Sequence, residues 1–210
     1  MATEMMVYTG GALMCNGYLV RGTGGEWLAV DAPAGFAAWA QSRLPEGARL
    51  THLLLTHQHF DHIQDAAALR RATGCSIHAA SPYTPELTLA QNARQWGIAP
   101  PEEFAVDAPA GGGDTRADWG GLRWEILHIP GHSRDSLVYV LPEEGELFSG
   151  DVLFAGSIGR SDFPGGSSAD LTRGIRSKIL PLPPQMSVHP GHGPSTTVGD
   201  EELNNPFLQG

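Results

Sequence analysis

Cysteine is scarce in this chain of 210 residues, which contains only Cys15 and Cys75. The two lie far apart in the sequence and neither belongs to a Cys-x-x-Cys motif, so the usual signature of a cysteine-based metal or redox site is missing. We therefore predict two buried, reduced thiols, with a disulfide between them as the alternative. Reduced thiols fit a cytoplasmic location.

Basic residues are also few. Thirteen lysines and arginines face 23 aspartates and glutamates, which gives a formal net charge of −10 at pH 7. Only Arg70 and Arg71 are adjacent. Because a protein that neutralises phosphate groups needs a basic patch, this pattern argues against nucleic acid and against an anionic membrane surface as partners.

Long hydrophobic runs are missing as well. No stretch approaches the roughly 18 uninterrupted apolar residues of a membrane-spanning helix. The first ten residues have no lysine or arginine ahead of an apolar segment, so we predict no signal peptide. An apolar fraction of 41% is nevertheless enough for a hydrophobic core, and the length suits one domain.

The order of apolar segments and turn residues predicts two groups of strands with helices around them. We expect strands at 5–9, 16–20, 27–31, 52–56 and 75–78, and helices at 35–44 and 65–73. A second series of strands is expected at 122–129, 136–141, 146–149 and 186–189, with a helix at 169–179. Residues 81–95 could be helical, whereas 108–113 and 156–168 are expected to be loops. This order suits a buried sheet covered by helices.

The strongest functional signal is the segment THQHFDH at residues 56–62, which follows an apolar strand and precedes a helix. On a regular strand His57, His59 and Asp61 would share one face, and in a loop these side chains can converge from several directions. Neutral imidazole and carboxylate groups are the ligands that borderline divalent metals such as zinc prefer. The segment therefore predicts part of a metal site.

A metal site needs more ligands than one tight loop usually supplies, so further candidates are expected at other strand ends. His132 lies in the segment PGHS, Asp151 in SGD and His192 in PGHGP, each after a predicted strand. Each residue alone is also an ordinary turn residue. Together with the segment at residues 56–62, however, the three residues indicate a metal site.

The ordered set HQHFDH, PGHS, SGD and PGHGP resembles the metallo-β-lactamase superfamily over roughly residues 19–208. The segments FSGDVLFAGSIGRSDFPGG and HPGHGPSTTVGDEELNNPFL resemble, more narrowly, the short, single-domain glyoxalase-II-like hydrolases of bacteria. The resemblance implies an α/β fold, the αββα sandwich, as one domain over residues 1–210. Longer glyoxalase II enzymes carry a C-terminal helical domain that binds glutathione, and we expect none in this chain.

The resemblance also implies two divalent metal ions, with zinc favoured and iron or manganese as alternatives. It assigns one ion to His57, His59 and His132, the other to Asp61, His62 and His192, and the bridging position to Asp151. Asp61 and Asp151 are accordingly the expected catalytic residues.

Two metal ions can hold a hydroxide that is nucleophilic at neutral pH, and a metal can polarise a carbonyl group. The leaving thiolate of a thioester is a weak base and needs no dedicated general acid. The resemblance implies hydrolysis of a small-molecule thioester by attack of the bridging hydroxide. The implied substrate is S-D-lactoylglutathione, which would give D-lactate and glutathione.

Several charged residues and histidines outside this set have two possible roles. Arg160 matches a cationic glutathione contact of longer glyoxalase II enzymes, and its alternative is a solvated loop charge. Asp31 could brace the metal loop or cap a turn. Asp135 is expected to point to solvent rather than into the site. Three basic residues are expected on the exposed face of a helix, with contact to a substrate carboxylate as the alternative: Arg173, Arg176 and Lys178. Four histidines are expected to be structural or on the surface: His52, His78, His128 and His189.

Three other functions remain open. A mononuclear iron persulfide dioxygenase shares the element GRSDF at residues 159–163. A lactonase or β-lactamase would use the same metal chemistry on another carbonyl. A metal-binding scaffold without catalysis is disfavoured because all seven expected ligands are present. The tail HPGHGPSTTVG followed by NPFL favours the short hydrolases, and nothing in the sequence indicates an oligomeric state.

Overall fold

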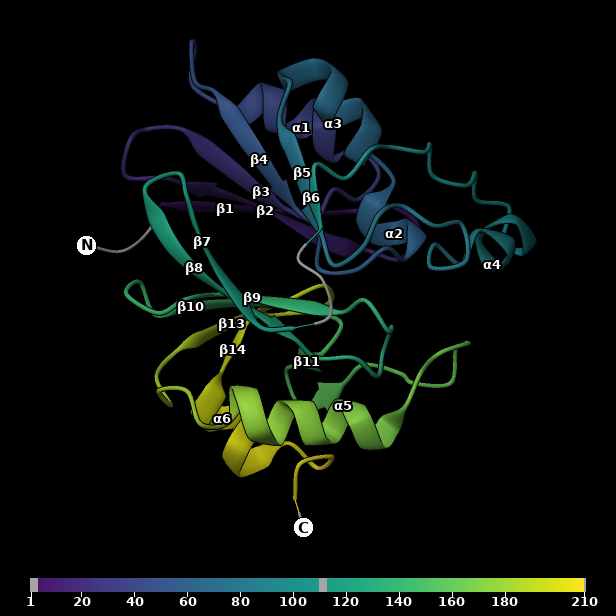
Figure 1. The fold of residues 1–210 in the computed structure, drawn as a ribbon, viewed down its shortest axis with the longest axis vertical. Coiled ribbons are helices and arrows are strands. Elements are labelled where there is room, and N and C mark those ends of the chain that lie inside the picture. Colours follow the sequence, from purple (N-terminus) through teal and green to yellow (C-terminus); the bar gives the residue numbers. More distant parts are fainter. Residues whose placement is uncertain (1–3, 110–112, 210) are drawn as a thin grey trace.

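Two six-stranded sheets pack face to face in the computed structural model, which describes residues 4–109 and 113–209 (Figure 1). The first sheet has the order β1-β2-β3-β4-β5-β6, with strands β1 (Met5–Gly10), β2 (Cys15–Arg21), β3 (Trp27–Val30), β4 (Leu50–Leu54), β5 (Ser76–Ala79) and β6 (Ala108–Pro109). The second has the order β14-β13-β10-β9-β8-β7, with strands β7 (Thr115–Trp119), β8 (Leu122–His128), β9 (Leu137–Leu141), β10 (Glu146–Gly150), β13 (Ser187–Pro190) and β14 (Thr196–Thr197). A small third sheet pairs β11 (Leu153–Phe154) with β12 (Ser157–Ile158).

Helices cover the outer face of each large sheet. Figure 1 shows α1 (Phe36–Arg43) and α3 (Ala66–Thr73) over the first sheet, and α5 (Ser168–Gly174) and α6 (Val198–Asn204) over the second. A π-helical turn at Ile175–Ile179 continues α5. The short helices α2 (Phe60–Ile63) and α4 (Ala90–Gln95) lie at one end of the sandwich. The layers confirm the predicted αββα sandwich as a single domain.

Strand alternation explains how each sheet buries both faces, because successive side chains point to opposite sides. In β2, Leu19 packs into the core beneath α1 and α3, whereas Tyr18 and Val20 enter the core between the sheets. Trp124 of β8 and Phe148 of β10 close that inner core from the second sheet. The segments therefore appear as nearly continuous apolar runs in the sequence.

Strand direction brings the predicted ligands to one end of the molecule. Strands β8 and β10 both run antiparallel to β9, and β13 runs parallel to β10, so the carboxyl ends of these three strands meet at one edge. The loops that follow them carry His132, Asp151 and His192. Residues 57–62 follow the carboxyl end of β4 in the first sheet. One end of the sandwich thus collects side chains that lie far apart in the sequence.

Most predicted elements are present with ends shifted by a few residues, but several predictions are wrong. The helix predicted at 81–95 is confined to 90–95, because Pro82 and Pro85 interrupt its first half. The two-residue strands β6 and β12 lie in segments predicted to be loops, and part of the first segment lies outside the described residues. Strand β7 and helix α6 have no counterpart among the predicted elements, because neither has a clear apolar pattern. Pairing with β8 stabilises β7, and the Thr197 side chain caps the first turn of α6.

Both cysteines are buried and free, as predicted. Cys15 begins β2, and Cys75 precedes β5. Within the described ranges, no helix is both long enough and apolar enough to cross a membrane.

Candidate metal centre

Three histidines form a first cluster at the end of the sandwich. His132 Nε2 lies 3.2 Å from His57 Nε2 and 2.9 Å from His59 Nδ1, and all three residues are buried. Tetrahedral coordination with metal–nitrogen bonds of about 2.0–2.1 Å separates two nitrogen ligands by roughly 3.3 Å. The observed spacing is close to that value, so the three nitrogens fit around one small cation.

The environment keeps the imidazoles of His57 and His59 neutral, which is the form that binds metal. Burial lowers the pKa of His59 to about 3 and holds that of His57 well below its ordinary value. His132 Nδ1 lies 2.8 Å from the backbone oxygen of Arg160, and His57 Nδ1 lies 3.1 Å from Thr56 Oγ1. These contacts on the outer ring nitrogens fix the rings while the other nitrogens face one another.

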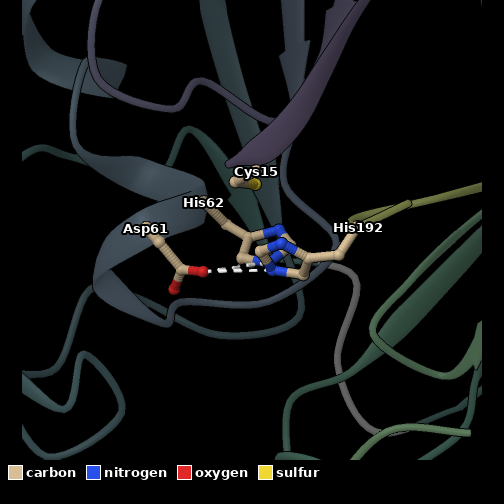
Figure 2. A group of neighbouring side chains, drawn as sticks. All are labelled: Cys15, Asp61, His62 and His192. Carbon is tan, nitrogen blue, oxygen red and sulfur yellow. Dashed lines mark ion pairs between the residues drawn. The ribbon is translucent and has the colours of Figure 1, made fainter. Parts of the chain in front are cut away.

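A second cluster combines Asp61, His62 and His192, with the thiol of Cys15 beside them (Figure 2). His192 Nε2 lies 3.2 Å from Asp61 Oδ2, and His62 Nε2 lies 3.8 Å from the same oxygen. Asp61 and His62 come from α2, whereas His192 follows β13. The cluster therefore joins the two halves of the sandwich.

Asp151 lies between the two clusters. Its Oδ1 is 3.2 Å from His62 Nε2, and its Oδ2 is 3.5 Å from His132 Nε2 and 3.6 Å from His192 Nε2. One carboxylate thus faces nitrogens of both groups. The structure brings together all seven residues that the sequence nominates as ligands.

Two buried polar atoms in the centre show what kind of group fits there. His62 Nε2 and Asp151 Oδ1 are buried and lie 3.2 Å apart, but among the described residues neither atom forms a hydrogen bond of acceptable geometry. Unpaired buried polar atoms are costly, and a metal ion is one group that satisfies them. Although burial disfavours its charge, the neighbouring Cys15, Asp151 and Asp31 raise the pKa of His62 well above its ordinary value. The histidine nitrogens and carboxylate oxygens of the centre, together with the acidic groups around His62, therefore fit divalent cations.

Asp31 braces the second cluster and does not merely cap a turn. Its Oδ2 lies 2.8 Å from His62 Nδ1 and accepts a hydrogen bond from Thr56 Oγ1 at 2.7 Å, while its Oδ1 accepts one from the Thr56 backbone N–H at 2.8 Å. The residue has a φ of 56°, an uncommon backbone conformation for a side chain other than glycine. The carboxylate directs His62 Nε2 toward the centre by binding the opposite ring nitrogen.

The expectation that Asp135 points to solvent is wrong. The residue is 4% exposed, its Oδ2 accepts a hydrogen bond from the Gln58 backbone N–H at 3.1 Å, and Ser133 Oγ donates to its Oδ1. Burial raises its pKa. Asp135 thus ties the loop of residues 57–62 to the loop that carries His132. Sequence reasoning missed this role because the partner is a backbone group 77 residues away.

A cavity of about 370 Å³ opens onto the centre. The site side chains His59, Asp61, His132, Asp151 and His192 form part of its wall. Most of the remaining wall is apolar and consists of Leu13, Phe60, Leu89, Trp96, Phe154 and Phe163. The cavity suits a small molecule with an apolar portion.

Arg160 lines this cavity but already has a partner. Its Nε and Nη2 each lie 2.7 Å from an Asp162 carboxylate oxygen, and its guanidinium carbon lies 4.1 Å from the centre of the Phe163 ring. The hydrogen bond from Arg160 lowers the pKa of Asp162 to about 2. The guanidinium is therefore held at the cavity wall with its charge balanced.

The other charged candidates lie away from the centre. Arg173 pairs with Asp170, Arg176 donates to the Leu208 backbone oxygen, and Lys178 pairs with Asp114 at 2.6 Å. None of the three lines the cavity at the centre. The histidines predicted to be structural or on the surface have local partners: His52 with His78, His128 with the backbone of Arg134, and His189 with Glu146.

Comparisons with known proteins agree with this geometry. A model of the metallo-beta-lactamase superfamily matches residues 10–192. The hydroxyacylglutathione hydrolase GloC of Haemophilus influenzae is 36% identical over 183 residues, which are 86% of each chain. The crystal structure of BLEG-1 B3 metallo-beta-lactamase is 34% identical with a TM-score of 0.89, covering 99% of this chain and 100% of that one. The crystal structure of TTHA1623 in a di-iron-bound form is 35% identical with a TM-score of 0.85, and the match covers 97% of this chain and 100% of that one. The chain therefore belongs to the metallo-β-lactamase superfamily.

Proposed function

We propose that this metal-dependent hydrolase cleaves thioesters, with glutathione thioesters such as S-D-lactoylglutathione as its substrates. The observation that carries the proposal is the convergence of seven histidine and aspartate side chains beside a cavity. The likeness to the hydroxyacylglutathione hydrolase GloC supports the choice of substrate.

In this proposal the centre holds two divalent ions, with zinc favoured over iron and manganese. His57, His59 and His132 would hold one ion, Asp61, His62 and His192 would hold the other, and Asp151 would supply the carboxylate between them. When bound, the ions acidify a water molecule for attack and polarise the carbonyl oxygen of the substrate.

The protein's own side chains prepare the rest of the reaction. Asp31 and Thr56 keep His62 oriented, and Asp135 holds the metal loop at a fixed distance from His132. Water adds its oxygen to the acyl carbon, the carbon–sulfur bond breaks, and the sulfur leaves as a thiolate that takes up a proton from solvent. Since this thiolate is a weak base, the reaction requires no additional acid from the protein.

Arg160 is the proposed contact for a carboxylate of the substrate. An arginine and a carboxylate form a strong two-point interaction. Asp162 occupies that position in the structure, so an anionic substrate would have to displace it. The apolar wall of the cavity would receive the less polar part of the thioester.

A second candidate is hydrolysis of a β-lactam or lactone, which the likeness to BLEG-1 B3 metallo-beta-lactamase favours. The persulfide dioxygenase remains a prediction from the GRSDF segment at residues 159–163. Elemental analysis of the purified protein, combined with assays on a thioester, a lactone, a β-lactam and a persulfide, separates these functions. We expect two divalent ions per chain and fastest turnover of the thioester.

Asp151→Ala should lose metal, and its kcat/KM should fall by more than about 100-fold, the upper range for residues that only support ligands. Absence of thioester turnover by fully metal-loaded protein would refute the proposed function. One iron per chain with oxygen uptake on a persulfide would replace it with the dioxygenase.

A further inference from the structure

Cys15 lies directly beside the second cluster, although the seven ligands discussed above do not include it. The residue is 0% exposed and begins β2. It pairs across an antiparallel bridge with His192, and the neighbouring Asn16 N–H donates to the Gly191 backbone oxygen at 2.7 Å. The strand that carries the thiol is thus fixed to the loop that carries a candidate ligand.

The thiol completes a four-atom group. One atom each from Cys15, Asp61, His62 and His192 forms a set in which all atoms lie within 4.8 Å of one another. Figure 2 shows the sulfur beside the two imidazoles, with Asp61 on the side facing His192. For zinc–sulfur and zinc–nitrogen bonds of about 2.3 and 2.0–2.1 Å, tetrahedral geometry separates sulfur from nitrogen by roughly 3.6 Å. The separations in the set therefore exceed that value by at most about 1.2 Å.

A second observation points to a ligand at this position. His62 belongs to this set and is completely buried; its Nε2 lies 3.2 Å from Asp151 Oδ1 but forms no hydrogen bond of acceptable geometry in the described parts of the chain. The thiol itself donates a long, weak hydrogen bond to the Asn16 backbone oxygen, at 3.6 Å. An imidazole nitrogen without a hydrogen bond and a weakly bonded thiol thus belong to one buried group of potential ligands.

We propose that Cys15 Sγ is a further ligand of the second metal ion, which gives that site one sulfur, two nitrogen and one carboxylate donor before Asp151 is counted. The inference rests on the metal binding in the proposed function but not on its substrate. As the sulfur–metal bond forms, the thiol proton is released to solvent. Because thiolate is a softer ligand than imidazole, it should strengthen the preference of the second site for zinc over manganese.

Cobalt(II) substitution tests the inference without an activity measurement, because a thiolate bound to cobalt gives a near-ultraviolet charge-transfer absorption. Apoprotein is titrated with cobalt to two equivalents, for the natural chain and for Cys15→Ser and Cys75→Ala. Cys75 is the matched control, since it is the other buried free thiol and belongs to the core beneath α1 and α3.

We expect the absorption in the natural chain and in Cys75→Ala, and its loss in Cys15→Ser with at least about tenfold weaker binding of one equivalent. Two bound equivalents without the absorption in the natural chain, or its persistence in Cys15→Ser, would overturn the inference while leaving the hydrolase proposal intact. A chain that binds no cobalt would refute the metal centre and the inference together.

X-ray absorption on the zinc-loaded natural chain requires no variant and therefore covers the case in which Cys15→Ser does not fold. It should show a sulfur neighbour at about 2.3 Å. A zinc spectrum with nitrogen and oxygen neighbours alone would also overturn the inference.

Discussion

Replacing Asp31 by asparagine tests whether a carboxylate outside the metal ligands controls the second cluster. Asp31 Oδ2 receives both the Thr56 hydroxyl and the His62 Nδ1 group, and Oδ1 receives the Thr56 backbone N–H. An asparagine has only one oxygen to accept hydrogen bonds. If that oxygen keeps the Thr56 backbone contact, its NH2 group faces His62 Nδ1 and must donate to it.

The consequence is a change of tautomer in His62. With Nδ1 accepting, the ring proton moves to Nε2, the nitrogen that points into the second cluster, and a protonated nitrogen cannot bind a metal. If the amide turns the other way, its NH2 group faces the Thr56 N–H and leaves two buried donors opposed. Both orientations therefore weaken the centre.

We expect Asp31→Asn to weaken binding of one metal ion by about 10- to 100-fold, the range for loss of such supporting contacts. This corresponds to about 1.4–2.8 kcal/mol. Competition with a coloured chelator measures the affinities of both equivalents. The ion held by His57, His59 and His132 should bind nearly as in the natural chain.

Asp65→Asn is the matched control. Asp65 Oδ2 accepts a hydrogen bond from the Ala37 backbone N–H at 3.0 Å, and in the described part of the chain its carboxylate forms no hydrogen bond or ion pair with the seven candidate ligands. The Asp65→Asn variant should be less stable than the natural chain but should bind both metal ions with unchanged affinity. If Asp31→Asn bound both ions within about twofold of the natural chain, the tautomer argument would be refuted.

Three further predictions concern the site wall, the substrate and the pH dependence. Gly191→Ala places a methyl group against Asp151 Oδ1, so metal content by elemental analysis should fall, and an unchanged content would contradict the bridging role. Asp162→Asn removes the carboxylate that occupies Arg160, so KM for an anionic thioester should decrease with kcat within about twofold, and an unchanged KM would count against that contact. Burial lowers the pKa of His78 from 6.5 to about 4, so its contribution to stability is complete above pH 6.5 and is lost as the pH falls toward 4. In urea unfolding between pH 6.5 and 4, the free energy of unfolding of His78→Gln should fall by about 1–2 kcal/mol less than that of the natural chain, after allowance for solvent screening. Equal decreases in the two chains would show that His78 does not cause this pH dependence.

Local patterns predicted most of the sandwich because its strands and helices bury regular apolar faces. Leu53 and Leu54, for example, are both buried but on opposite sides of the first sheet, so the strand appears as an apolar run. Strand β7 was not predicted because it is a short, largely exposed segment without a regular apolar pattern, and pairing with β8 defines it. The first half of the predicted helix at 81–95 failed because the proline positions outweigh helical composition.

The sequence by itself determined the candidate ligands, since seven histidine and aspartate residues follow strands in an order that resembles one superfamily. Tertiary structure alone decided how those residues are supported. It buried Asp135 against a backbone N–H of the metal loop, directed Asp31 to the outer nitrogen of His62, and brought Cys15 to the second cluster. The paired residues are separated by between 31 and 177 positions in the sequence. Such pairings are fixed by the packing of the sheets rather than by local spacing.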